Sequence, residues 1–398
     1  MSYCVTTVGA VLKAIVSGKS IRTLERPAQQ NEFGILKVSA VTWGEFRPAE
    51  SKAMPLEYDP GECPRAMDGD ILISRANTRE LVGAPVMVHG DHPRLLLSDK
   101  LLKLIPDETA VDSRYLVRAL RSAGAALHFS QCAGGSSGSM TNITQGDIRS
   151  APLPLPPLPE QRRIAAILDQ ADALRAKRQE ALAQLDSLTQ SIFIEMFGDP
   201  AANPKGWEAA TLGDLIFSAT DGPHVSPSYS ETGIPFLSTR HVRRGEISWS
   251  DLKFLSPADA EVQWKKCRPE RGDILYTKGG TTGLAAAVRT EEAFAVWVHV
   301  ALLKPDSAKV ETEWLESMLN ADFCYRQSQD LTHGIANRDL GLKRMVKIRM
   351  YRPPSSLQRE FVERKERVNA LRASSYLALA ELDALFASLQ HRAFSGGL

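Results

Sequence analysis

The sequence predicts an α+β fold: two mixed α/β domains in a pseudo-two-fold repeat, separated by two long helices that pair as an antiparallel coiled coil. Three observations predict it. One segment recurs at an offset of 197 residues, each copy contains a long stretch without glycine or proline, and both halves carry short apolar runs after a Gly-Asp turn. A duplication of this kind indicates one structural unit used twice.

The repeat is clearest where residues 156–197 lie on residues 353–394 without a gap, with 16 identities in 42 positions. Upstream the similarity weakens, and GDILISRANT at Gly69 matches GDILYTKGGT at Gly272 with an offset of 203. The halves therefore carry different insertions. We expect four domains, listed here in chain order: 1–155, a first mixed α/β domain; 156–199, a central helix; 200–352, a second mixed α/β domain; and 353–398, a C-terminal helix.

Each well-matched tail opens with proline and continues as a helix. Proline is tolerated in the first helical turn, and the residues that follow are rich in Ala, Leu, Arg, Glu and Gln, which favour helix. A heptad frame places apolar residues at most a and d positions, as a coiled-coil seam requires. The residues predicted from this frame to pair the helices or to bind partner subunits are Ile164, Ile167, Leu174, Leu185, Leu188, Leu371, Leu382 and Leu385. The alternative is that each helix packs only on its own globular half.

The front part of each half reads as mixed α/β. Apolar runs after the Gly-Asp turns at Gly69 and Gly272 indicate strands. The segments 113–131 and 312–329 read as helices that begin at a polar residue. A polar loop follows the Gly-Asp strand in each half, and Arg, Asn, Lys and Thr are the residue types that pair with phosphates and base edges.

These loops and three further polar sites supply the candidate DNA-contact residues. His224 lies in the turn-like segment DGPHVSP, Arg240 in a basic cluster, and Asn337 in the loop THGIANRDL. The full set is Arg75, Asn77, Thr78, Arg79, His224, Arg240, Lys278, Thr281, Thr282 and Asn337. An ordinary polar turn is the competing interpretation of each loop, and the repeat favours the functional one.

Bulk composition excludes several classes of protein. The chain has 398 residues, a net charge of +1 and five scattered cysteines without a metal-ligand spacing. We expect a cytoplasmic protein with free thiols and no membrane association, because no secretory signal or long apolar run occurs. The near-zero net charge does not by itself indicate nucleic-acid binding, but local basic clusters can be balanced elsewhere.

Sequence motifs for catalysis are not found. GKS at Gly18 resembles the end of a phosphate-binding loop, but the earlier glycine that this loop needs is replaced by Lys13. The sequence has no HExxH, no GxSxG and no Asn-Pro-Pro-aromatic motif of the kind that amino-methyltransferases use. We therefore predict a non-catalytic chain without a catalytic residue, bound metal or cofactor of its own.

The segment PLPLPPLPEQRRIAAILDQADALRAKRQEALAQLDSLTQSIFIEMFGDP resembles the central region of type I restriction–modification specificity subunits. Its Pro-rich start, Glu160-Gln161 and the closing MFGD are typical of that family. GDILISRANTRELVG, TDGPHVSP and GSSGSMTNIT look like parts of its target-recognition domains. The C-terminal copy departs from the pattern, since it begins SSLQREFVERKERVNA, and we expect it to pack less regularly.

The resemblance implies a division of labour. Each recognition domain would read one half of a bipartite double-stranded DNA target, and the helices would set the spacer and dock two methyltransferase subunits. S-adenosylmethionine would be bound by those partners, and ATP and Mg would serve restriction subunits where these are present. Helix length predicts half-site centres on the order of 10–15 bp apart.

Two other functions remain open from the sequence. A coiled-coil scaffold with protein-binding end domains would have the same helices, and an enzyme with an unfamiliar site would escape a motif search.

Overall fold

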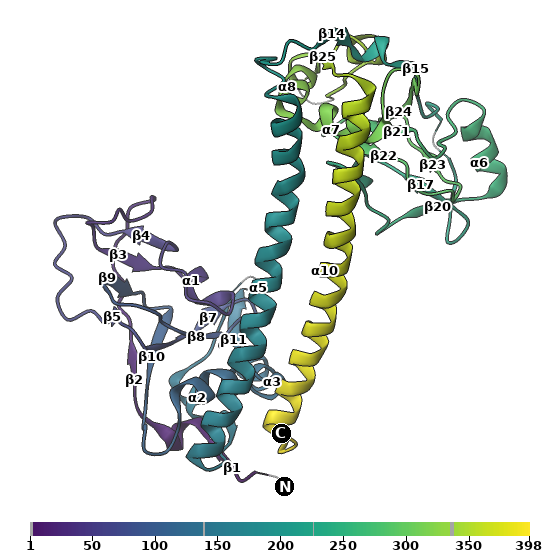
Figure 1. The fold of residues 1–398 in the computed structure, drawn as a ribbon. Helices are drawn as coiled ribbons and strands as arrows, with labels where there is room; N and C mark the ends of the chain where they lie inside the picture. The colour runs from purple at the N-terminus through teal and green to yellow at the C-terminus, as the bar shows by residue number, and fades with distance from the viewer. Residues whose placement is uncertain (1–2, 138–139, 226, 335–337) are drawn as a thin grey trace. The chain divides into compact units, whose positions relative to one another are not determined.

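The computed structural model describes residues 3–398 except 138–139, 226 and 335–337 (Figure 1). The chain divides into two compact units, which are described separately below. Unit 1 comprises Met1–Gln179 with Leu377–Leu398, and unit 2 comprises Glu180–Tyr376. Each unit therefore contains a mixed α/β domain, one part of the first long helix and one part of the second. The α+β class and the long paired helices predicted from the sequence are confirmed.

Unit 1 is built around a four-stranded antiparallel sheet with the strand order β2-β10-β6-β8. Its strands are β2 (Leu12–Ser17), β10 (Leu101–Pro106), β6 (Ile71–Ser74) and β8 (Pro85–Met87). A second sheet contains β4 (Ser51–Ala53), β3 (Gly34–Leu36), β9 (His92–Leu97) and β5 (Arg65–Ala66), with β3 and β9 parallel. Smaller pairings join β11 (Gly134–Ser137), β12 (Met140–Asn142) and β7 (Ala76–Asn77), and β1 (Val5–Thr7) with β13 (Pro152–Pro154).

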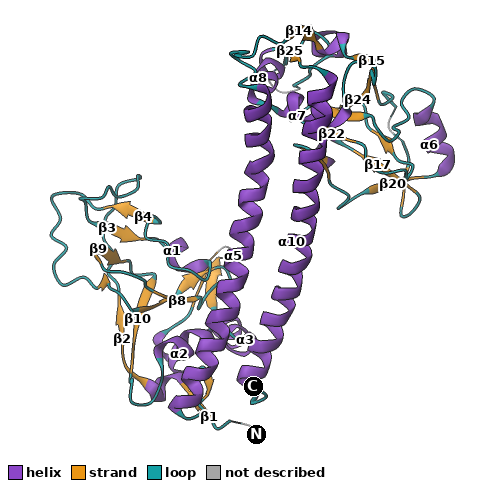
Figure 2. Ribbon diagram, in the orientation of Figure 1, coloured by secondary structure: helices purple, strands orange, loops and turns teal. Residues whose placement is uncertain are grey.

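Unit 2 repeats this plan with the order β15-β24-β21-β22. Its strands are β15 (Ile216–Asp221), β24 (Val300–Pro305), β21 (Ile274–Thr277) and β22 (Ala285–Ala287). The second sheet contains β16 (Tyr229–Ser230), β20 (Lys253–Leu255), β17 (Ile234–Leu237) and β23 (Ala295–Val296), again with one parallel pair, β17 and β23. Two-stranded pairings are β14 (Glu208–Thr211) with β25 (Arg349–Arg352) and β18 (Val242–Arg243) with β19 (Glu246–Ile247). Figure 2 shows these strands in orange.

Unit 1 has the shorter helices α1 (Ser39–Thr42), α2 (Ser113–Leu120), α3 (Ala123–Cys132) and α4 (Gln145–Ser150), and unit 2 has α6 (Pro257–Trp264), α7 (Thr312–Asn320), α8 (Asp322–Asp330) and α9 (Leu342–Met345). The helices α2, α3 and α4 correspond to α7, α8 and α9, whereas α1 and α6 lie at different places in the two units. Each of the two predicted domain helices is divided in two. In unit 1 the division lies at Ser122, whose hydroxyl accepts a hydrogen bond from the backbone N–H of Ala125 and so begins a new helix.

The long helices are α5 (Leu158–Phe197) and α10 (Ser355–Ser395), of 40 and 41 residues. In unit 1, Arg175 of α5 pairs with Asp383 of α10 at 2.6 Å. In unit 2, Arg372 of α10 pairs with Asp186 of α5 at 3.3 Å. These two ion pairs are equivalent under the 197-residue repeat and run in opposite senses, so the helices are antiparallel within each unit. The helix α10 is continuous over Ser355–Ser395, so the departure of its sequence from the first copy does not interrupt the helix.

A buried glutamine fixes the start of each long helix in the same way. The Gln161 amide donates to the carbonyls of Pro156 at 2.8 Å and Ala110 at 3.1 Å, and its oxygen accepts from the N–H of Asp112 at 2.8 Å. In unit 2, Gln358 makes the matching contacts with Pro353, Lys309 and Glu311. Both glutamines are fully buried. Each therefore joins a helix start to the segment that precedes α2 or α7.

The contact seam of the long helices differs from the predicted heptad frame. The predicted a positions are buried or half-buried in both helices, and so are the residues one place after the predicted d positions, whereas the d positions themselves are half-buried or exposed. Four predicted pairing residues are substantially exposed, with exposed fractions of 49% for Leu174, 39% for Leu188, 59% for Leu371 and 51% for Leu385. Ile164, Ile167, Leu185 and Leu382 are buried or half-buried. Counting leucines favoured the d position. The helices instead meet at the residue after it, where some residues, such as Arg175 and Arg372, are charged and form ion pairs.

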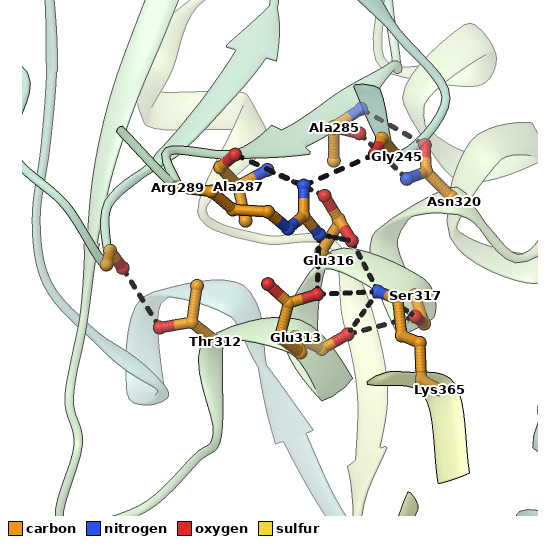
Figure 3. A network of polar contacts seen from close by, with 11 residues as sticks. Gly245, Ala285, Ala287, Arg289, Thr312, Glu313, Glu316, Ser317, Asn320 and Lys365 are labelled. Carbon is orange, nitrogen blue, oxygen red and sulfur yellow. Dashed lines mark hydrogen bonds and ion pairs between the residues drawn. The ribbon is translucent and has the colours of Figure 1, made fainter. Parts of the chain in front are cut away.

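The charged contacts that hold each domain to a long helix have opposite polarity in the two units. In unit 1, the Arg118 guanidinium on α2 binds Asp169 and Asp172 of α5, each at 2.8 Å. In unit 2, Figure 3 shows Lys365 of α10 reaching Glu313 and Glu316 on α7, at 2.9 and 2.5 Å. Burial opposes ionisation of Glu313, but the neighbouring cations outweigh it and lower the pKa of this carboxyl.

Among the residues that the structure describes, no helix is both long and apolar enough to cross a lipid bilayer.

Candidate nucleic-acid interface

Lys278 occupies the central place among the predicted contact residues of unit 2. It follows β21 directly, and its side chain is only 7% exposed. The Lys278 Nζ lies 3.1 Å from Asp221 Oδ2 and 3.2 Å from Asp339 Oδ1, and donates to the Val298 carbonyl at 3.4 Å. A residue predicted to point at DNA is thus enclosed by two carboxylates and a backbone oxygen.

These partners bring together loops that are distant in the sequence. Asp221 ends β15 and precedes the loop that carries the exposed His224. Asp339 and His333 exchange two backbone hydrogen bonds, which close a loop next to Lys278. Asn337, another predicted contact residue, lies outside the described residues.

The pKa of Asp221 reflects its position between two lysines. Burial acts to raise its pKa, but hydrogen bonds from Lys266 and Lys278 outweigh burial and lower the pKa below the ordinary value. Lys266 Nζ approaches Asp221 Oδ1 at 2.5 Å. Asp221 is therefore a buried anion that balances two cations. Asp221 and Asp339 were not predicted as partners of Lys278, because they lie far from it along the chain and no sequence pattern links them.

The remaining predicted residues of unit 2 divide into exposed and structural ones. Thr281 is exposed, whereas Thr282 is buried and its hydroxyl accepts a hydrogen bond from Thr332 at 3.0 Å. Arg240 is exposed, but its guanidinium donates to the Asp251 carbonyl at 2.7 Å. Thr281 and His224 are consequently the predicted side chains here that stand most open to a ligand.

Arg75 is the counterpart of Lys278 in unit 1. It follows β6, and its carbonyl accepts from the Ile143 N–H at 2.9 Å, as the Lys278 carbonyl accepts from Leu340 at 2.7 Å. Within the described part of the chain, no carboxylate pairs with the half-buried Arg75. Equivalent positions therefore differ in charge environment: the arginine has no anionic partner and the lysine has two.

The other predicted residues of unit 1 lie next to Arg75. Thr78 is exposed, and Asn77 lies on β7, where its amide donates to the Thr42 hydroxyl at 3.1 Å. Arg79 is exposed but donates to the carbonyls of Ser130 and Ala133 at 3.3 and 3.4 Å. Four predicted residues thus share one surface segment.

A metal site is not evident in the described residues, because no group of three or more His, Cys, Asp or Glu side chains could hold an ion there.

The comparisons with known proteins all lead to one family. The type I restriction modification DNA specificity domain matches residues 62–184. The EcoEI specificity subunit of Escherichia coli is 29% identical over 195 residues, which are 46% of this chain and 32% of that protein. The MjaX putative specificity subunit of Methanocaldococcus jannaschii is 24% identical, over 61% of this chain and 62% of its own length. The aligned part therefore spans 32% and 62% of the lengths of these two relatives.

Solved structures show the same fold over nearly the whole chain. A chain from a study of type I R-M complex assembly has a TM-score of 0.60 at 19% identity and covers 100% of this chain and 98% of its own. The S subunit of the type I system from M. genitalium has a TM-score of 0.59 at 14% identity, with 99% and 96% covered. The family model and the sequence relatives support the recognition of this chain as a type I restriction–modification specificity subunit, and the solved structures show that it shares their fold.

Proposed function

We propose that this chain is the DNA sequence-specificity subunit of a type I restriction–modification complex, and that each recognition domain reads one half of a bipartite duplex target. One observation carries the proposal. Both units place a polar loop after the equivalent strand, β6 or β21, on the same sheet order, yet the loops present different side chains. A constant scaffold with divergent exposed loops is what two different half-sites require.

The decisive experiment maps methylated bases in DNA from cells that carry the complete system. We expect methylation at a two-part sequence with an unspecified spacer. Replacing unit 2 residues 222–352 with those of another specificity subunit should change only one half of the sequence. Methylation without a bipartite sequence, or a change in both halves, would contradict the proposal.

We further propose that chemistry takes place on other subunits. Methyl transfer from S-adenosylmethionine would occur on modification subunits, and ATP- and Mg-dependent cleavage on restriction subunits. The purified chain should transfer no labelled methyl group to DNA until a methyltransferase subunit is added. Methyl transfer by the chain alone would show that it is an enzyme.

Exposed leucines on the long helices support docking of two methyltransferase subunits. Leu174 and Leu371 are equivalent under the repeat, and so are Leu188 and Leu385. Exposed apolar side chains can contribute to a protein interface, and the repeat places these leucines at equivalent positions of the two helices. Leu174→Asp or Leu371→Asp should each reduce the number of methyltransferase subunits that co-purify from two to one. Glu180→Asp, an exposed conservative change, is the control.

The long helices would set the spacer between half-sites. Seven residues inserted after Gln179 and seven after Tyr376 would leave the ion pair Arg175–Asp383 within unit 1 and Arg372–Asp186 within unit 2. The added length of about 10 Å corresponds to roughly three base pairs. We expect the methylated sequence to gain about that spacer length. An insertion in α5 alone should abolish activity, and an unchanged spacer in the double insertion would disprove this role.

A further inference from the structure

We propose that Lys278 positions three DNA-reading loops of unit 2 and does not itself contact DNA. This inference rests on the proposed function, since it assigns a role within the recognition surface. The Lys278 ammonium is the common partner of Asp221, at the start of one loop, and Asp339, at the end of another, while Lys278 itself begins the third. One buried cation thus joins segments that lie far apart in the chain.

The carboxylates next to Lys278 already balance its positive charge. Asp221 and Asp339 are the carboxylates within reach, and their other contacts are cationic: Lys266 lies 2.5 Å from Asp221, and Arg344 lies 3.5 Å from Asp339. A phosphate at Lys278 would have to displace two carboxylates from a side chain that is 7% exposed. Lysines that contact phosphate are instead exposed, and their binding releases counterions from the DNA.

Backbone contacts at Lys278 and the two residues after it also fix the shape of the loop. The Lys278 N–H donates to the His299 carbonyl at 2.9 Å, and the Gly280 N–H donates to Arg338 at 3.1 Å. At Gly279, a Cβ atom would lie 2.3 Å from the His299 ring, so the loop packs there without room for a side chain. Among the described residues, the exposed side chains on these loops include those of His224, Thr281, His333 and Arg338. Their relative placement depends on the Lys278 ion pairs.

Unit 1 provides an internal contrast. Its counterpart Arg75 has no carboxylate partner among the described residues, so it is free to contact a phosphate or a guanine. The matched variants are therefore Lys278→Met and Arg75→Met, each of which replaces a cation with an uncharged chain of similar length. Lys278→Met is expected to fold, because Lys266 still balances Asp221 and the Asp339 side chain is 45% exposed. Asp339→Asn is a second variant that breaks the same link from the other side.

The first test needs no DNA. In hydrogen–deuterium exchange on the full chain, Lys278→Met and Asp339→Asn should each speed exchange in 222–225, 279–283 and 338–340 by at least about tenfold, with exchange in β21 and β24 unchanged. Unchanged exchange in all three loops would overturn the proposal. This result stands whether or not the chain binds DNA, so a failure of the DNA-reading function is recognised separately.

The second test measures how binding to a random-sequence duplex depends on salt. Loss of one phosphate contact lowers the slope of log K against log salt by about 0.9. Arg75→Met should show that loss, whereas Lys278→Met should keep the wild-type slope. A pool of random duplexes enriched on Lys278→Met should lose sequence preference in one half-site only. A slope reduced by about 0.9 in Lys278→Met would instead identify Lys278 as a direct phosphate contact and overturn its positioning role.

Discussion

In unit 1 the domain helix α2 presents a cation, Arg118, to carboxylates on the long helix, whereas in unit 2 the domain helix α7 presents carboxylates to Lys365 on the long helix. The position equivalent to Lys365 in α5 is Leu168, and both side chains are buried. The repeat has therefore kept a charged contact between the domain helix and the long helix, but neither the positions nor the charges of the residues that make it. Each domain is matched to its own long helix, while the glutamine anchors at the helix starts are the same.

The largest effect is expected from Lys365→Met. It leaves Glu316, which is 1% exposed, with one cationic partner in place of two, and breaking a buried pair costs about 3 kcal/mol. Chemical denaturation, monitored by the fluorescence of unit 2, would measure the loss in the free energy of unfolding. Glu316→Gln in the same chain keeps the acceptor for the Ala287 N–H and should recover part of it. An additive double variant would show that the two side chains are not coupled.

The glutamine anchors should behave alike in both units. Gln161→Ala and Gln358→Ala each remove three hydrogen bonds from a buried site, and unsatisfied buried groups predict a loss of about 2 kcal/mol in either unit. Exchange protection of α2 and of α7 would report each unit separately. A cost confined to one unit would break the equivalence that the repeat implies.

The ion pairs between α2 and α5 in unit 1 should stabilise the fold less than those between α7 and α10 in unit 2. Asp169 and Asp172 are each 35% exposed, so water can solvate them when Arg118 is replaced. Arg118→Met is therefore expected to cost about 1 kcal/mol, measured as the loss of hydrogen–deuterium exchange protection in α2 of unit 1. A cost equal to that of Lys365→Met would show that burial does not distinguish the two sets of ion pairs.

The smallest expected effect depends on pH and is confined to unit 2. Burial is the largest influence on His241 and lowers its pKa below the ordinary 6.5, while its Nδ1 accepts the Ser238 N–H at 2.8 Å. The unfolded chain then binds a proton more readily, so stability present above pH 6.5 is lost as pH falls below it. The buried Ala40 holds the matching place in unit 1. Exchange protection in 238–248, corrected for the pH dependence of the intrinsic exchange rate, should fall between pH 7 and 5.5 in wild type, and this fall should weaken in His241→Asn.

Local features of the sequence were enough to predict the repeat, the long helices and the loops after the Gly-Asp strands. Composition without glycine or proline specifies a helix, and duplication implies that both copies fold alike. The second seam position of the helices was predicted wrongly, because apolar counting excludes residues such as Arg175 and Arg372 that lie in the seam as paired ions. The division of each domain helix into two was also missed.

The sequence by itself determined that two related units share a pair of long helices and that a polar loop stands at the same place in each. Only the tertiary structure decided what each loop cation does. Lys278 and Arg75 look alike in sequence, since both follow a Gly-Asp strand. Asp221 and Asp339 reach Lys278 through chain folding, and no matching carboxylate pairs with Arg75 in the described residues. Charge pairing depends on distance in space, which a linear pattern does not specify.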